Sequence, residues 1–150
     1  MSKIFQQFNI VEPIRTKTFV MGGHTFKVNV PLSTELDAML EKIALTNADT
    51  IKERLNKMTV ALTEAPVEGV EIKDGDVLVD GKSTKDVVVS VLQMENRITE
   101  YFKLLVPEEG TMDDITYSDI DAEFPLQVQL EMVEKITEAI QPGYKEARKN

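Results

Sequence analysis

The chain has no cysteine and no tryptophan, and it contains a single histidine, His24. Without cysteine it cannot form disulfides, thiolate metal sites or a cysteine nucleophile, and it suits a reducing cytosol. A Ser/His/Asp triad would depend on His24, which follows two glycines and fits an exposed turn residue better. We therefore expect a protein without catalytic residues, cofactors or bound metal, located in the cytoplasm.

Long apolar runs and a surplus of positive charge are also missing. The longest apolar runs, such as "VVVSVL", fall far short of the roughly 20 residues that cross a bilayer. Polar residues interrupt the N-terminal stretch, which argues against a signal peptide. Acidic residues number 26 against 17 basic ones, a net charge of -9 that repels phosphate backbones and anionic membranes. We expect a soluble protein with no nucleic-acid or membrane partner.

The glycines lie in turn signatures, "MGGH", "KDGD" and "VDGK", rather than in nucleotide-binding motifs. None has the spacing of a dinucleotide fingerprint or of a phosphate-binding loop. The chain therefore gives no sign of phosphate binding.

What the sequence does contain is the pattern of one globular domain over residues 1–150, with 42% hydrophobic residues. Phe26, Val28 and Val30 alternate with polar residues, and the two glycines before them predict an N-terminal β-hairpin. Val70 and Ile72 before an Asp-Gly turn, followed by further alternating valines, predict a second hairpin in the middle of the chain. The fold class is α+β, a mostly helical domain with these two small hairpins packed on about four helices.

Apolar residues at helical spacing predict the helices, and Ser/Thr followed three residues later by Asp predicts where three of them begin. The predicted capping pairs are Thr34 with Asp37, Ser83 with Asp86, and Ser118 with Asp121. Thr46–Thr50 predicts a joint between two helices or a bend in one. The four predicted inward stripes are Leu36, Leu40, Ile43; Ile51, Leu55, Met58, Leu62; Val87, Val91, Met94, Ile98, Tyr101, Leu105, widened by Val88, Leu92 and Phe102; and Leu126, Leu130, Val133, Ile136, Ile140.

An acidic stretch, Val106–Pro125, contains seven carboxylates and no basic residue. Asp119, Asp121 and Glu123 are spaced two apart, as in calcium loops. An EF-hand would require glycine where Phe124 stands and glutamate where Leu130 stands, so the motif fails. We interpret the stretch as a solvated connection before the last helix, and we expect Asp113, Asp114, Asp119 and Asp121 to keep the protein dispersed or to contact a partner.

The two ends of the chain are the other candidates for partner binding. Residues 1–15 form a possible N-terminal arm whose Phe5, Phe8 and Ile10 have mixed spacing, so they could dock on the domain itself or on another subunit. Residues 142–150 form a short basic tail that contains Tyr144. A homo-oligomer is one possible use of the arm.

The segments "TFVMGGHTFKVNVPLSTEL" and "VEKITEAIQPGYKEARKN", with an α-rich region between them, resemble the tail assembly chaperones of siphovirus-like bacteriophages and prophages. The resemblance implies a non-catalytic protein that binds the tape measure protein, with the major tail (tube) protein as a further candidate partner, and that is absent from the mature virion. Such families often make a longer form by frameshifting, and Lys149 and Asn150 are compatible with a slippery codon pair.

Two other functions remain open at this point. A type III secretion-type effector chaperone shares the small size and acidity, although such chaperones usually open with a long helix rather than a hairpin. A carboxylate-metal hydrolase would depend on the acidic stretch alone.

Overall fold

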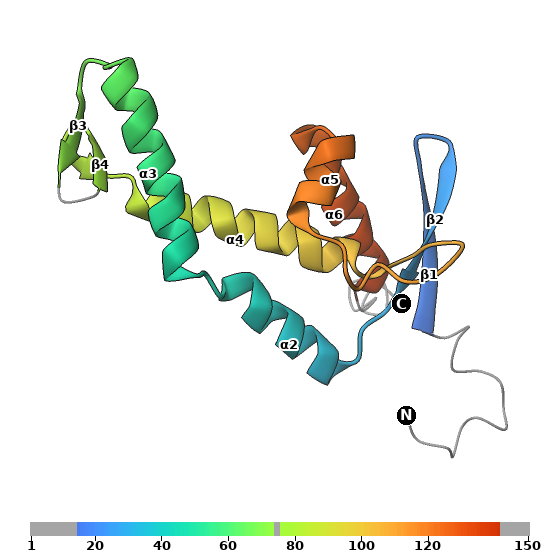
Figure 1. Ribbon diagram of the computed structural model, residues 1–150. Helices are drawn as coiled ribbons and strands as arrows, with labels where there is room; N and C mark the ends of the chain where they lie inside the picture. Colours follow the sequence, from blue (N-terminus) through green and yellow to red (C-terminus); the bar gives the residue numbers. More distant parts are fainter. Residues whose placement is uncertain (1–14, 74–75, 142–150) are drawn as a thin grey trace, which may run out of the picture. The chain divides into compact units, whose positions relative to one another are not determined.

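The structure, a computed structural model, describes residues 15–73 and 76–141 (Figure 1). The chain divides into two compact units: unit 1 contains the residues up to Met39 and from Ile98 onward, and unit 2 contains Leu40–Arg97. The described residues form five helices and two small antiparallel sheets. This confirms the predicted α+β class, mostly helical with one hairpin near the N-terminus and one in the middle of the chain. That residues 1–150 form a single domain stays a prediction.

The sheet of unit 1 is built on the predicted N-terminal hairpin. Strands β1 (Thr16–Met21) and β2 (His24–Asn29) pair antiparallel, and Gly22 and Gly23 make the turn with φ of 60° and 76°. Glycine adopts these positive φ values without the steric penalty of a side chain. Phe19 and Phe26 lie opposite each other, their rings stacked with centroids 5.3 Å apart.

A third strand in this sheet was not predicted. Strand β6 (Leu105–Val106) pairs with β2, where Leu105 lies opposite the fully buried Val28. The prediction that Leu105 continues a helical stripe is therefore wrong, because helix α4 (Lys85–Phe102) ends three residues earlier. Its buried side chain belongs to the sheet instead.

Helices α5 (Tyr117–Glu123) and α6 (Leu126–Ile140) complete unit 1, and α6 packs on β1 and β2. The predicted stripe on α6 is half right: Val133 and Ile136 are buried, whereas Leu126 and Leu130 are each 45% exposed. The remaining buried positions of this helix are Gln129 and Met132. The core of unit 1 also takes in Val28, Met39, Ile98, Tyr101, Phe102, Leu105 and Ile120.

Unit 2 is built around α3 (Ala48–Glu64) and α4 as far as Arg97. Ile51 and Leu55 pack against Val88 and Leu92, with Met58 and Val89 at the margin, which confirms the first three positions of the predicted stripe on α3. Its fourth position, Leu62, is half-buried. The predicted second hairpin is present as β3 (Val70–Lys73) and β4 (Asp76–Val79), with β5 (Lys82–Ser83) added beside β4. The predicted turn at residues 74 and 75 lies outside the described residues.

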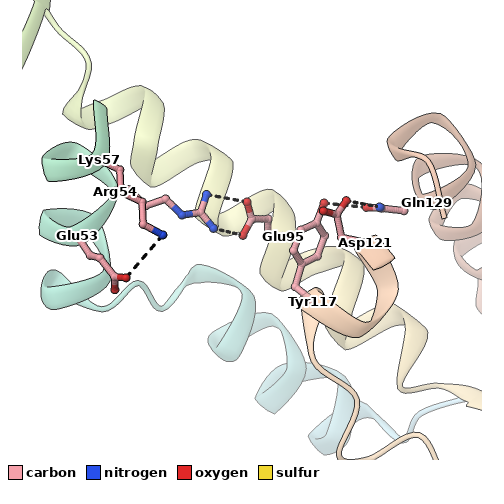
Figure 2. Close-up of polar contacts among 7 residues, drawn as sticks. All are labelled: Glu53, Arg54, Lys57, Glu95, Tyr117, Asp121 and Gln129. Atoms are coloured by element: carbon pink, nitrogen blue, oxygen red, sulfur yellow. Dashed lines mark hydrogen bonds and ion pairs between the residues drawn. The ribbon is translucent and has the colours of Figure 1, made fainter. Parts of the chain in front are cut away.

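Polar side chains of helix α4 form hydrogen bonds with α3 and with the C-terminal end of α2 (Ser33–Ala44). The Arg54 guanidinium donates to both carboxylate oxygens of Glu95 at 2.9 and 2.7 Å (Figure 2). Asn96 donates to the Leu45 carbonyl at 2.9 Å, and Gln93 donates to the Ala44 carbonyl at 3.2 Å. These amides satisfy carbonyls that helix α2 leaves unpaired at its C-terminal end.

On α2 and α4 the predicted inward stripes are partly wrong. Met39 is the buried residue of α2, while the predicted Leu40 is 47% exposed. On α4, Ile98, Tyr101, Val88, Leu92 and Phe102 are buried as predicted, but Val87 in the first turn is 59% exposed.

The helix starts also differ from the predicted capping pairs. At α2 the Glu35 carboxylate accepts from the Leu32 N–H at 2.9 Å, two residues earlier than the predicted pair of Thr34 with Asp37. At α4 the Ser83 hydroxyl accepts from the Lys85 N–H at 3.2 Å, and the buried Thr84 hydroxyl donates to the Val77 carbonyl at 2.7 Å. The joint within residues 46–50 is confirmed, because Asn47 caps α3 by accepting from the Asp49 N–H at 2.7 Å.

Within the described part of the chain, every helix is too short or too polar to cross a bilayer.

Candidate functional site

Negative charge is concentrated in one part of the described chain, from the end of β6 through α6. Residues 108–138 contain ten acidic residues and one basic residue, a net charge of -9 that equals the net charge of the whole chain. All ten carboxylates are exposed, whereas Lys135 is half-buried. The ten are Glu108, Glu109, Asp113, Asp114, Asp119, Asp121, Glu123, Glu131, Glu134 and Glu138.

Part of this charge has a structural role at the start of α5. The Thr116 hydroxyl accepts from the Asp119 N–H at 3.3 Å, and the Asp119 carboxylate accepts from the Thr116 N–H at 3.0 Å. This reciprocal capping box satisfies two backbone donors at the helix N-terminus. The predicted box at Ser118 and Asp121 is therefore wrong by two residues, because the acidic stretch forms a helix of its own before α6 begins.

The other structural carboxylate is Asp121, which binds a buried amide at the joint between α5 and α6 (Figure 2). Gln129 is fully buried, and its amide nitrogen donates to the Asp121 carboxylate at 3.1 Å and to the Phe124 carbonyl at 2.7 Å. The Tyr117 hydroxyl donates to the Gln129 amide oxygen at 2.9 Å. Both polar atoms of this side chain are thus hydrogen-bonded, so its burial leaves neither of them without a partner.

The structure does not bring the other predicted partner-binding residues together with Asp119 and Asp121. Asp113 and Asp114 are exposed, and among the described residues their carboxylates make no hydrogen bond or ion pair. Phe5, Phe8, Ile10 and Tyr144 lie outside the described residues, as do the basic tail and all of the predicted arm except its last residue, Arg15. Asp119 therefore serves the start of α5 and Asp121 the joint between α5 and α6, and Asp113 and Asp114 are the ones available to a partner.

The carboxylates were also the best metal candidates. Among the described residues, however, no three Asp, Glu or His side chains lie close enough together to hold a metal ion. The spacing of two between Asp119 and Asp121 instead serves two different hydrogen-bond partners, Thr116 and Gln129.

This division of the acidic residues gives a direct test. Replacing Asp119 with alanine is expected to lower the free energy of unfolding by about 1 kcal/mol, because it removes half of a capping box. The double substitution of Asp113 and Asp114 by asparagine is expected to change it by less than about 0.5 kcal/mol, as for other unpaired surface positions. Urea titrations followed by circular dichroism would measure both, and equal losses in the two variants would contradict the assignment.

Exposed apolar side chains are the feature that the sequence reading missed. In the described residues of unit 2, more large apolar side chains are exposed than buried. The exposed ones are Leu40, Leu45, Val60, Val67, Ile72, Val79 and Val87, against Ile51, Leu55, Val77, Val88 and Leu92 in the core. In unit 1, Val20, Leu32, Leu126 and Leu130 are exposed.

Unit 1 also has an open hollow of about 550 Å³ beside the C-terminal end of α6. Its lining is mostly apolar, with Val30, Leu36 and Ile140 among the residues, and it includes Tyr101 and Thr137. The described lining contains one cation, Lys17, and no carboxylate or imidazole. This chemistry suits an apolar segment better than a reaction that needs an acid or a base.

Comparison with known proteins adds no assignment: no family model matches the chain, and neither does any curated protein or solved structure. Any proposal for its function therefore rests on the chain's own residues.

Proposed function

We propose that the protein is a non-catalytic tail assembly chaperone of a siphovirus-like bacteriophage or prophage. In this proposal it acts in the host cytoplasm, where it binds the tape measure protein, and the tail tube protein as a further client, before and during tail polymerisation. It would not be retained in the mature virion.

The observation that carries this proposal is the excess of exposed over buried large apolar side chains in unit 2. Exposed apolar side chains provide contact area for a client whose own apolar surface is unprotected. A protein that displays such side chains needs charge to stay dispersed, and the surplus of carboxylates between residues 108 and 138 supplies it.

The element order is a second, weaker support. The segment "TFVMGGHTFKVNVPLSTEL" that carries the resemblance forms a hairpin followed directly by α2, and the C-terminal segment contains the second half of α6. A protein whose work is binding also needs no buried acid or base, and the hydrogen bonds at Asp119, Asp121 and Gln129 are accounted for by the fold.

Co-expression with a client tests the proposal. The proposal requires a long coiled-coil tape measure protein encoded in the same genome, and this client is expected to move from the insoluble to the soluble fraction and to co-purify with the tagged chain. A secretion effector of similar length serves as the matched control, and it should remain insoluble. If the tape measure protein is equally insoluble with and without the chain, or if only the effector is retained, the proposal is wrong.

A further inference from the structure

The exposed side of α6 combines apolar and acidic residues in an ordered way. Leu126 and Leu130 are each 45% exposed and lie four residues apart, so they are neighbours on one side of the helix. Glu134 and Glu138 continue the same line over the next two turns, and Glu131 lies next to Leu130. We name these five residues the outer face of α6: one apolar half followed by one acidic half.

The two leucines are exposed although the same helix buries a polar residue between them. Gln129 is fully buried with its three hydrogen bonds, and Leu130, its immediate neighbour, is left in solvent. The exposed 45% of each leucine gains nothing from the fold of unit 1, whereas burial against a partner would remove this apolar surface from water. Their position beside an acidic half therefore raises the question of which partner covers them.

Charge decides among the candidate partners. The outer face lies in the segment with a net charge of -9, and the one basic residue of that segment, Lys135, is half-buried. A second copy that docked through the same face would bring two such segments together, and an anionic polymer or membrane would be repelled. A positively charged, amphipathic helix has the complementary charge and apolar groups.

We propose that the outer face of α6 binds a basic amphipathic helix of a client protein, one that presents two apolar residues one turn apart followed by Lys or Arg on the next two turns. This inference rests on the proposed function in that it assumes a client. The leucines anchor the helix, and the glutamates select for positive charge and speed association, because exposed ion pairs alone contribute little affinity.

Peptide binding to the full chain tests the proposal without knowledge of the client. The probe is a labelled synthetic helix with two leucines one turn apart and arginines on the next two turns, and fluorescence anisotropy measures its affinity. We expect L126A/L130A and E131K/E134K/E138K each to weaken binding at least about tenfold. The matched control E41K/E64K/E68K makes the same change in charge at exposed positions of unit 2 and should stay within about twofold.

Two altered peptides test the apolar half and the acidic half of the outer face separately. Alanine in place of the leucines, or glutamate in place of the arginines, should each abolish most of the binding. The proposal is wrong if the alanine peptide binds as well as the original, or if the unit 2 control loses as much affinity as the α6 variants, since net charge would then explain both results. It is also wrong if sedimentation shows a dimer that L126A/L130A dissociates, because a second copy would then occupy the face.

The design keeps this result distinct from that of the proposed function. All five substituted side chains are exposed, and circular dichroism checks that each variant is folded; if the leucine variant unfolds, the lysine variant alone decides. In the co-expression assay, a client held equally well by wild type and by both α6 variants overturns the role of the face but leaves the chaperone proposal standing. If no client is held but peptide binding is intact, the chaperone proposal is wrong and the binding role of the face stands.

Discussion

Replacing Gln129 with alanine is expected to lower the free energy of unfolding by about 2–4 kcal/mol. The substitution removes a fully buried side chain that joins three residues of α5 and the α5–α6 joint. Water can reach the exposed Asp121 and the partly exposed Tyr117 in the variant, so their losses are small. The Phe124 carbonyl and the cavity left by the amide account for most of the effect. Urea denaturation followed by circular dichroism measures it.

Two further variants serve as controls for Gln129. Leu130→Ala changes the neighbouring exposed residue on the same helix and should stay within about 0.5 kcal/mol. Tyr117→Phe removes one of the three hydrogen bonds and should cost about 1 kcal/mol. A Gln129 variant as stable as the Leu130 variant would show that the buried amide does not hold the α5–α6 joint.

Elements fixed by local pattern were predictable from the sequence. The turn at Gly22 and Gly23 and the alternation that follows it determine the first hairpin, because few other residues adopt φ of 60° and 76° in succession. The stripe of Ile51 and Leu55 on α3 was equally clear, since that helix has one apolar side and uses it in the core of unit 2.

Features fixed by tertiary contacts were not predictable. Leu105 continues a helical spacing of three and four along α4, yet pairing with β2 takes it into the sheet. Pattern reading places leucine inside and glutamine outside, so it could not foresee Gln129 in the core, where three partners brought by the fold satisfy its amide. The exposure of Leu126 and Leu130 was missed for the same reason.

The acidic stretch contains one feature that could be predicted from the sequence and one that could not. That some of its carboxylates would cap a helix was foreseeable from a Ser or Thr followed three residues later by Asp. Thr116 with Asp119 and Ser118 with Asp121 both satisfy this rule, and the sequence does not distinguish them. The fold chooses the first pair because Asp121 is held by Gln129 eight residues later, a contact that no local pattern contains.

Phe102→Ala is expected to have the largest effect of all, a loss of about 3–5 kcal/mol in the free energy of unfolding. Phe102 is the last residue of α4 and is 1% exposed. Its ring meets the ring of Phe124 edge to face, with centroids 5.9 Å apart. The substitution removes a large apolar side chain from the core of unit 1 and leaves a cavity that the helix end cannot close. Thermal and urea unfolding measure it.

The matched control is Val87→Ala at the other end of α4, where the side chain is 59% exposed and the change should stay within about 0.5 kcal/mol. Similar losses in the two variants would mean that Phe102 is not in a packed core.

Phe124 also links this prediction to the first one, because Phe102 contacts its ring and Gln129 binds its carbonyl. A cycle with the milder Phe102→Leu and Gln129→Ala should therefore be non-additive by about 0.5 kcal/mol or more. Strict additivity would show that the two side chains stabilise α5 and α6 independently of Phe124.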